Sequence, residues 1–159
     1  MSGTGNTESL QTLLQPLMDR IAACAFDPVL AEGLRRDFPA DGAFFAEIET
    51  ACHAAIAAGW MCSKGSGGRR FGRVIEPSPS THRLSVDVVD LIDIVGPHHR
   101  HPTGEVCMIM PVTPAARFDG MPRGWCVYPP GSSHRPTVTG GEAIVLYLLP
   151  GGEIEFTGQ

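Results

Sequence analysis

The sequence predicts a mainly β protein with an N-terminal helical extension, in which the strands form a small antiparallel β-barrel or sandwich. Over residues 1–60, apolar residues repeat at spacings of three and four, as on one face of a helix. After Trp60 glycine and proline become frequent, and short apolar segments alternate with turn sequences. Because turns rather than helices connect these segments, we expect their strands to pair antiparallel.

Two helices are expected first. The apolar face of the first begins at Leu10, and Pro16 should kink or interrupt this helix because proline lacks a backbone donor. Asp27 followed by Pro28 is a typical N-cap and first-turn pair for a second helix, which should end near Arg36.

The third helix is predicted to lie between Asp41, as its N-cap, and Gly59, which should end it. His53 should lie on its exposed surface. Residues 1–60 should pack their apolar faces against the strands of the same chain or of a second subunit. In the third helix this face consists of Phe44, Phe45, Ile48, Cys52, Ala55 and Ile56.

Residues 61–159 are expected to form the β-domain. Its first long strands are RRFGRVIEP and RLSVDVVDLIDIV, and the doubled Val88-Val89 shifts the alternation and predicts a β-bulge. Later segments of the same kind are EVCMIMPV, GWCVYP, EAIVLYLLP and GEIEFTG. Because no internal repeat divides them, the chain should hold one helical extension, residues 1–60, and one β-domain.

Composition and charge exclude several classes of protein. The formal charge of −5 and the lack of a dense basic stripe argue against a nucleic-acid partner. No apolar run approaches the roughly 20 residues that span a bilayer, and the polar N-terminus lacks the pattern of a signal peptide. The five cysteines are scattered without a CxxC pair, which favours reduced thiols in the cytoplasm over a disulfide framework.

Three of the six histidines lie within the ten residues GPHHRHPTGE. On a strand, His99 and His101 point to one face and His98 to the other, so a register shifted by one residue would replace His99 with His98. Glu105 follows a Pro-Thr-Gly turn, and His134, in PPGSSHRPTV, follows a later strand. Imidazole and carboxylate suit Zn, Fe, Mn or Ni, so the pattern predicts one divalent metal ion; an exposed polar loop is the alternative.

The two segments resemble the signature motifs of the cupin superfamily. The resemblance implies a small β-barrel whose interior holds one divalent metal ion, bound by three histidines and one glutamate. The motifs read HxHxxxE, at His99, His101 and Glu105, and PxGxxH, at Pro129, Gly131 and His134.

The sequence departs from the cupin pattern in its turns. Gly96 precedes His99 by only three residues, where a longer spacing is usual. Pro111 and Val112 stand where a glycine is expected after the glutamate, and Val138 replaces the asparagine that often ends the second motif. These differences concern turns more than ligands.

Within that superfamily the chain is similar to a bacterial group that contains 4-hydroxylaminobenzoate lyase. The likeness rests on GPHHRHPTGEVCMIMPV and GWCVYPPGSSHRPTV behind the helical residues 1–60. It implies a metal-dependent lyase that converts 4-hydroxylaminobenzoate to 3,4-dihydroxybenzoate (protocatechuate) and ammonia in nitroaromatic degradation. An Fe(II) dioxygenase acting on a small aromatic substrate and a non-catalytic protein that binds a small ligand remain open alternatives. We expect a homodimer.

Glu105 and Tyr128 are the candidate catalytic residues, Tyr128 as a proton donor. Strand alternation places Met108 and Met110 on the opposite face from Glu105, where they should pack in the outer core. An aromatic carboxylate would need a cation to hold it. Six arginines are open candidates for this cation, namely Arg69, Arg70, Arg83, Arg117, Arg123 and Arg135.

Overall fold

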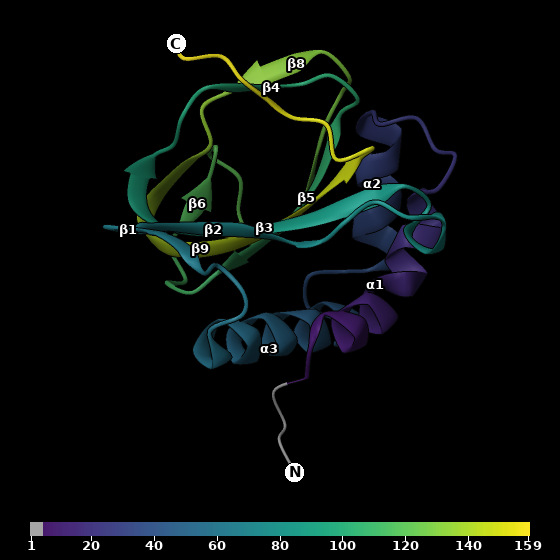
Figure 1. Ribbon diagram of the computed structural model, residues 1–159, viewed down its shortest axis with the longest axis horizontal. Coiled ribbons are helices and arrows are strands. Elements are labelled where there is room, and N and C mark those ends of the chain that lie inside the picture. Colours follow the sequence, from purple (N-terminus) through teal and green to yellow (C-terminus); the bar gives the residue numbers. More distant parts are fainter. Residues whose placement is uncertain (1–4) are drawn as a thin grey trace.

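The computed structural model describes residues 5–159, and residues 1–4 of the polar N-terminal stretch lie outside them. Two antiparallel sheets face each other, and α1 and α3 lie against the far side of the larger one (Figure 1). The larger sheet has the strand order β1-β2-β3-β9-β5-β7, with β6 paired to β9, and the smaller has the order β10-β4-β8. The predicted mainly β, antiparallel fold with N-terminal helices is confirmed. Hydrogen bonds among residues 5–159 leave two separate sheets rather than one continuous closed barrel.

The elements have the following bounds. The helices are α1 (Thr7–Ile21), α2 (Pro28–Asp37) and α3 (Ala43–Ala58), with a 3-10 turn, η1, at Pro79–Thr81. The strands are β1 (Lys64–Ser66), β2 (Arg69–Ile75), β3 (Leu84–Val95), β4 (His99–His101), β5 (Glu105–Pro111), β6 (Arg117–Phe118), β7 (Gly124–Tyr128), β8 (Ser132–His134), β9 (Thr137–Pro150) and β10 (Glu155–Phe156). No helix among residues 5–159 is long and apolar enough to cross a membrane.

The first helix differs from its prediction at the proline. Its N-cap is Asn6, which accepts a hydrogen bond from the backbone N–H of Ser9, and the helix then runs through Pro16 without a break. Pro16 is exposed, whereas its neighbours Leu14 and Leu17 are fully buried. The burial of these leucines therefore holds the turn together despite one lost backbone hydrogen bond.

The ends of the other two helices were predicted with one error. Asp27 caps α2 as expected, and its side chain accepts a hydrogen bond from the backbone N–H of Leu30. Gly59 ends α3 in the left-handed conformation, with φ of 90°, as its freedom from a Cβ allows. The predicted N-cap Asp41 is wrong, because the helix begins one residue later behind Gly42, which has no side chain to form a cap.

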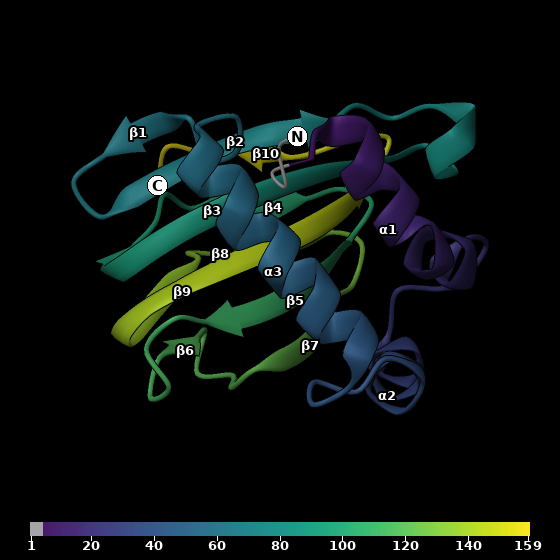
Figure 2. The same ribbon diagram turned by 90° about the horizontal axis from the view of Figure 1, so that it is seen from below.

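One core joins the helices to the larger sheet. Helix α3 crosses the outer face of this sheet (Figure 2), and its Phe45 and Ile48 are fully buried. Phe45 meets the edge of Trp125 on β7 with ring centroids 5.8 Å apart. Along β5 the side chains alternate, so Met108 packs in this core while Cys107 faces the space between the sheets. The predicted outward orientation of Met108 and Met110 is confirmed.

The irregularity in β3 lies later than predicted. The pairing of β3 with β9 is continuous through Val88 and Val89, so the bulge predicted there is wrong. The register shifts between Ile92 and Ile94 instead, where Asp93 has a positive φ of 40°. Both valines fit the pleat because one packs toward the helices and the other toward the interior.

We expect Phe45→Ala to lower the free energy of unfolding by about 3–5 kcal/mol, because it removes a buried aromatic side chain from the contact between α3 and the sheet. Chemical denaturation of both proteins measures the difference. His53→Ala on the same helix is the control, since His53 is exposed and its loss should change stability little. Equal stability of Phe45→Ala and the wild type would contradict the described packing.

Candidate metal centre

Four side chains meet between the two sheets. His99 and His101 come from β4, and His134 ends β8, where it pairs directly opposite His99. Glu105 begins β5, and one donor atom from each of these four residues lies within 4.8 Å of the others. The sequence therefore identified a set of residues that the fold brings together.

The turn before Glu105 requires glycine. Gly104 has a positive φ of 89°, and a Cβ at this position would lie 2.9 Å from the Tyr128 carbonyl oxygen. Only glycine lets the chain pass so close to β7. This close passage puts Glu105 opposite Tyr128 in the β5–β7 pairing and turns its carboxylate toward the histidines.

The Nε2 atoms of the three imidazoles point toward one another. The Nε2 atoms are 3.0 Å apart between His99 and His101, and 2.9 Å apart between His99 and His134. The third Nε2 pair, between His101 and His134, is separated by 3.1 Å. Glu105 Oε1 lies 3.3 Å from the Nε2 of His101 and 3.9 Å from that of His134.

This donor set fits one divalent cation. A neutral imidazole protonated on Nδ1 presents a lone pair at Nε2, and three such lone pairs repel unless a cation accepts them. Two nitrogens bound at right angles to one ion, each at about 2.1 Å, would be about 3.0 Å apart. The observed separations of 2.9–3.1 Å match that arrangement.

Burial keeps the two histidines of β4 neutral and able to bind a cation. It lowers the pKa of His99 to about 4 and that of His101 to about 3, with the neighbouring imidazoles adding to the effect. Both rings are therefore neutral at physiological pH, as metal binding requires. Burial also raises the pKa of Glu105 to about 7, because the carboxylate lies among apolar walls, while a hydrogen bond from Cys107 opposes this shift.

His98, the alternative ligand, lies outside the cluster. Its Nδ1 forms a hydrogen bond with the hydroxyl of Thr157, next to the C-terminal strand β10. His99 is 6% exposed and contributes the Nε2 atom that meets the other two histidines. The strand register thus places His99, and not His98, toward the interior.

Asp119 adjoins the cluster, although sequence analysis did not select it. Its Oδ2 accepts hydrogen bonds from His134 Nδ1, at 2.6 Å, and from the hydroxyl of Tyr128, at 2.5 Å. Burial alone would raise the pKa of Asp119, but the hydrogen bonds from His134, Tyr128 and the Thr137 N–H outweigh it, and the pKa is lowered. The available signal was the dipeptide Asp119-Gly120, which is typical of a two-residue hairpin turn.

Tyr128 forms a wall of the site. Its ring stacks on that of His101, with centroids 6.2 Å apart, and lies 4.5 Å from that of His134. Its hydroxyl points to Asp119, and burial together with this carboxylate raises its pKa. The role of Tyr128 as a proton donor stays a prediction.

A cavity of about 30 Å³ adjoins the cluster, which is roughly the volume of one water molecule in the liquid. Cys107 and Tyr147, neither of which was selected from the sequence, contribute to its lining. None of the six candidate arginines lines the cavity; Arg123 binds Glu49 on α3, and Arg70 binds Asp90. The full lining is Val89, His99, Glu105, Cys107, Phe118, His134, Pro136, Val145 and Tyr147.

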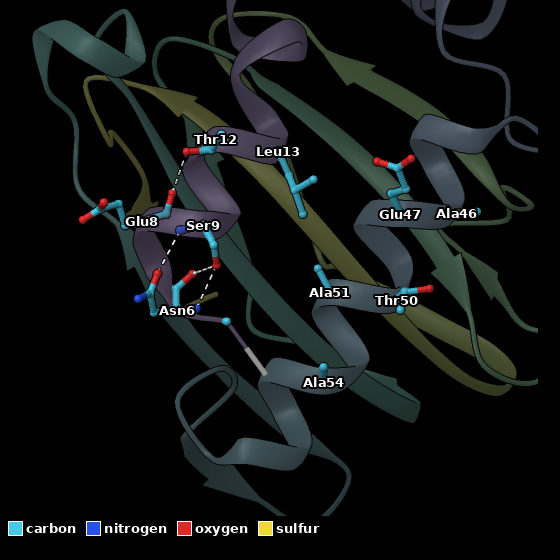
Figure 3. A pocket seen from close by; sticks show the side chains of 11 residues that line it. Asn6, Glu8, Ser9, Thr12, Leu13, Ala46, Glu47, Thr50, Ala51 and Ala54 are labelled. Atoms are coloured by element: carbon cyan, nitrogen blue, oxygen red, sulfur yellow. Dashed lines mark hydrogen bonds between the residues drawn. The ribbon is translucent and has the colours of Figure 1, made fainter. Parts of the chain in front are cut away.

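A larger hollow, of about 940 Å³, lies between α1 and α3 and is separate from the histidines (Figure 3). Three of its polar side chains are already engaged, because Asn6 and Ser9 bind each other in a capping box and Thr12 donates to the Glu8 carbonyl. Small side chains of α3, such as Ala51 and Ala54, line the other side. This hollow offers no donor set comparable to the histidine cluster.

Comparisons with known proteins agree on one family. A family model described as "PnbB: 4-hydroxylaminobenzoate lyase" matches residues 12–156. A 4-hydroxylaminobenzoate lyase from Nocardioides sp. (strain LMS-CY) is 34% identical over 108 residues, or 62% of this chain and 63% of that protein, which is less than two thirds of its length. A 4-hydroxylaminobenzoate lyase from Pseudomonas putida is 28% identical over 143 residues, or 79% of this chain and 81% of that protein.

One solved structure shares the fold over nearly the whole chain. DMSP lyase DddQ from Ruegeria pomeroyi DSS-3 covers 95% of both chains with a TM-score of 0.55 at 18% identity. A protein with a cupin-like fold from Ralstonia eutropha JMP134 covers 55% of this chain and 57% of its own, with a TM-score of 0.40 at 16% identity. At 18% identity the likeness to DMSP lyase DddQ concerns architecture alone.

We expect the purified protein to bind one equivalent of divalent metal per chain, and His101→Ala to abolish this binding because it removes a fully buried donor. Metal analysis after chelation and reloading measures the stoichiometry. His98→Ala is the matched control and should keep the metal, since His98 bonds to Thr157 instead. Loss of metal in His98→Ala together with its retention in His99→Ala would contradict the assignment.

Proposed function

Because the chain belongs to the 4-hydroxylaminobenzoate lyase family, we propose that it is a metal-dependent lyase that converts 4-hydroxylaminobenzoate to 3,4-dihydroxybenzoate and ammonia. The observation that carries the metal dependence is the convergence of four buried donors, His99, His101, Glu105 and His134. The family match is the reason for proposing 4-hydroxylaminobenzoate as the substrate. An enzyme of this kind would serve the breakdown of nitroaromatic compounds.

The proposed reaction balances with one molecule of water. The N–O bond of the hydroxylamine and the C–N bond to the ring break, two C–O bonds form at neighbouring ring carbons, and the nitrogen leaves as ammonia. The ring carbon whose C–H becomes C–OH loses the two electrons that reduce the nitrogen, so neither oxygen nor an external reductant is consumed. A bound divalent ion would supply Lewis-acid assistance to the departing hydroxylamine oxygen.

The residues of the chain would hold the ion and shape the space beside it. His99, His101 and His134 provide neutral nitrogen donors, and Glu105 provides the negative charge. We propose Glu105 as a catalytic residue through this contact. Phe118 and Val145 give the cavity apolar walls that suit an aromatic ring.

An aromatic substrate needs more room than the cavity now offers. At about 30 Å³ the space holds a water but not a benzene ring. The smaller sheet forms one side of the site, and β10 is joined to β4 by two residue pairs, Glu155 with Arg100 and Phe156 with His99. We propose that this short strand moves when the substrate enters.

The same donors would also serve an Fe(II) dioxygenase, which is the second candidate because three histidines and one carboxylate suit several metals. The family match favours the lyase. We further propose a homodimer in the cytoplasm. The cysteines Cys24, Cys52, Cys62, Cys107 and Cys126 are free thiols, as expected in a reducing compartment.

We expect the metal-loaded protein to release ammonia from 4-hydroxylaminobenzoate under nitrogen gas, with formation of the catechol product. Glu105→Gln should lower turnover by orders of magnitude because it removes the negative donor, while circular dichroism shows an unchanged fold. Ammonia and catechol assays with and without oxygen measure this. Oxygen uptake with ring opening would support the dioxygenase, and ligand binding without turnover of either kind would contradict both enzymes.

Tyr128 is the candidate proton donor from the sequence, and Tyr147, which lines the cavity, is a second candidate. Replacing each by phenylalanine distinguishes between them. A side chain that transfers a proton contributes about 10²–10⁴-fold to the rate. We expect Tyr147→Phe to lower kcat by such a factor with the metal retained, because Tyr147 lines the cavity. Tyr128→Phe should lower kcat less, since its hydroxyl is bound to Asp119. Steady-state kinetics compares the two variants, and the reverse order of effects would assign the proton to Tyr128.

A further inference from the structure

Asp119 accepts three hydrogen bonds, and two of them come from residues at the histidine cluster. Its Oδ2 accepts from His134 Nδ1 at 2.6 Å and from Tyr128 Oη at 2.5 Å. Its Oδ1 accepts from the backbone N–H of Thr137 at 2.9 Å. The side chain is therefore held at both oxygens.

The contact with Asp119 selects one tautomer of His134. Both oxygens of Asp119 accept hydrogen bonds, Oδ1 from the Thr137 N–H and Oδ2 from the Tyr128 hydroxyl. The contact of 2.6 Å with His134 is therefore one in which Nδ1 donates and carries the proton. The lone pair then lies on Nε2, which is the atom 2.9 Å from His99 Nε2 and 3.1 Å from His101 Nε2. In the opposite tautomer Nε2 would bear a hydrogen and could not bind a metal.

His134 has more need of this support than the histidines of β4. The side chain of His101 is fully buried, so packing restricts its ring. The side chain of His134 is 13% exposed and stands at the end of a strand of three residues. A carboxylate at Nδ1 therefore supplies the orientation that packing supplies at His101.

The turn that contains Asp119 is fixed by backbone hydrogen bonds, and this holds the carboxylate beside His134. Phe118 and Met121 exchange backbone hydrogen bonds of 2.9 and 2.8 Å across the pair Asp119-Gly120. Both central residues have positive φ, 49° at Asp119 and 79° at Gly120, as a tight hairpin requires. The Asp119 N–H also donates to the Thr137 carbonyl at 2.8 Å, which anchors the turn to β9.

We propose that Asp119 is a positioning residue that fixes the tautomer and ring orientation of His134, and with it the wall formed by Tyr128. The inference rests on the metal site of the proposed function. It assigns Asp119 no contact with substrate. The same carboxylate oxygen serves both neighbours, so the removal of Asp119 releases the imidazole and the phenol together.

The test is the metal affinity of Asp119→Ala, measured by titrating the metal-free protein with Co²⁺ or Zn²⁺ in competition with a chromophoric chelator. Loss of a carboxylate behind a metal-binding histidine typically weakens metal affinity by about 10–100-fold, and we expect a change of that size. Asp119→Asn keeps an acceptor oxygen and should recover part of the affinity. The visible spectrum of the Co²⁺ form should shift in Asp119→Ala.

Asp93→Ala is the matched control. Asp93 also has a positive φ, of 40°, and its carboxylate accepts from the backbone N–H of Gly141, but it contacts no histidine. We expect this variant to bind metal within about 2-fold of the wild type. Wild-type affinity in Asp119→Ala, or an equal loss in Asp93→Ala, would overturn the inference.

A measurement on the wild type keeps the inference testable even if Asp119→Ala does not fold. Long-range ¹H–¹⁵N spectra of the metal-free protein at mildly basic pH report which imidazole nitrogen carries hydrogen. We expect His134 to carry it on Nδ1, and a proton on Nε2 would refute the inference.

The metal titration and the NMR measurement need no substrate. A wild type that binds no metal would overturn the proposed metal site as well, whereas normal metal binding without lyase activity would leave the role of Asp119 standing.

Discussion

The interior of this fold places three imidazoles and a carboxylate together away from water, and the rest of the structure is arranged around that constraint. Polar groups are costly to bury unless they find partners. Glu105 is 2% exposed and His101 fully buried, yet Oε1 of the one lies 3.3 Å from Nε2 of the other. Three nitrogen lone pairs held this close repel one another unless a cation accepts them, and this makes the site suited to a cation.

The two faces of the larger sheet have different roles: one packs against the helices, and the other carries the candidate metal site. Along β5, Val106, Met108 and Met110 pack toward the helices, and Glu105 and Cys107 face the interior. The helical layer thus covers the apolar face with a large core that contains no ligand of the cluster. The interior face can consequently carry polar groups without weakening the main core.

Features that depend on local chemistry could be predicted from the sequence. The spacing of His99 and His101 follows from strand geometry, and Asp27 with Pro28 begins a helix by its own hydrogen bonds. The role of Asp119 could not be predicted, because its contacts with His134 and Tyr128 depend on how β6 and β9 place the turn.

Errors in the prediction have the same origin in tertiary context. The shift in β3 occurs at Asp93 rather than at the doubled valines, because both valines find apolar neighbours on opposite faces of the sheet. Pro16 leaves α1 intact because the helix is held by its buried face.

The position of the central strand β9 in the sequence has a consequence for folding. This strand pairs with β3, β5 and β6, yet it spans Thr137–Pro150 and is made long after β3 and the helices. During synthesis the larger sheet cannot assemble until this strand has left the ribosome, so the apolar faces of the helices stay uncovered until then. Folding is therefore dominated by contacts between distant parts of the chain, which makes it slow relative to a helical protein of the same length.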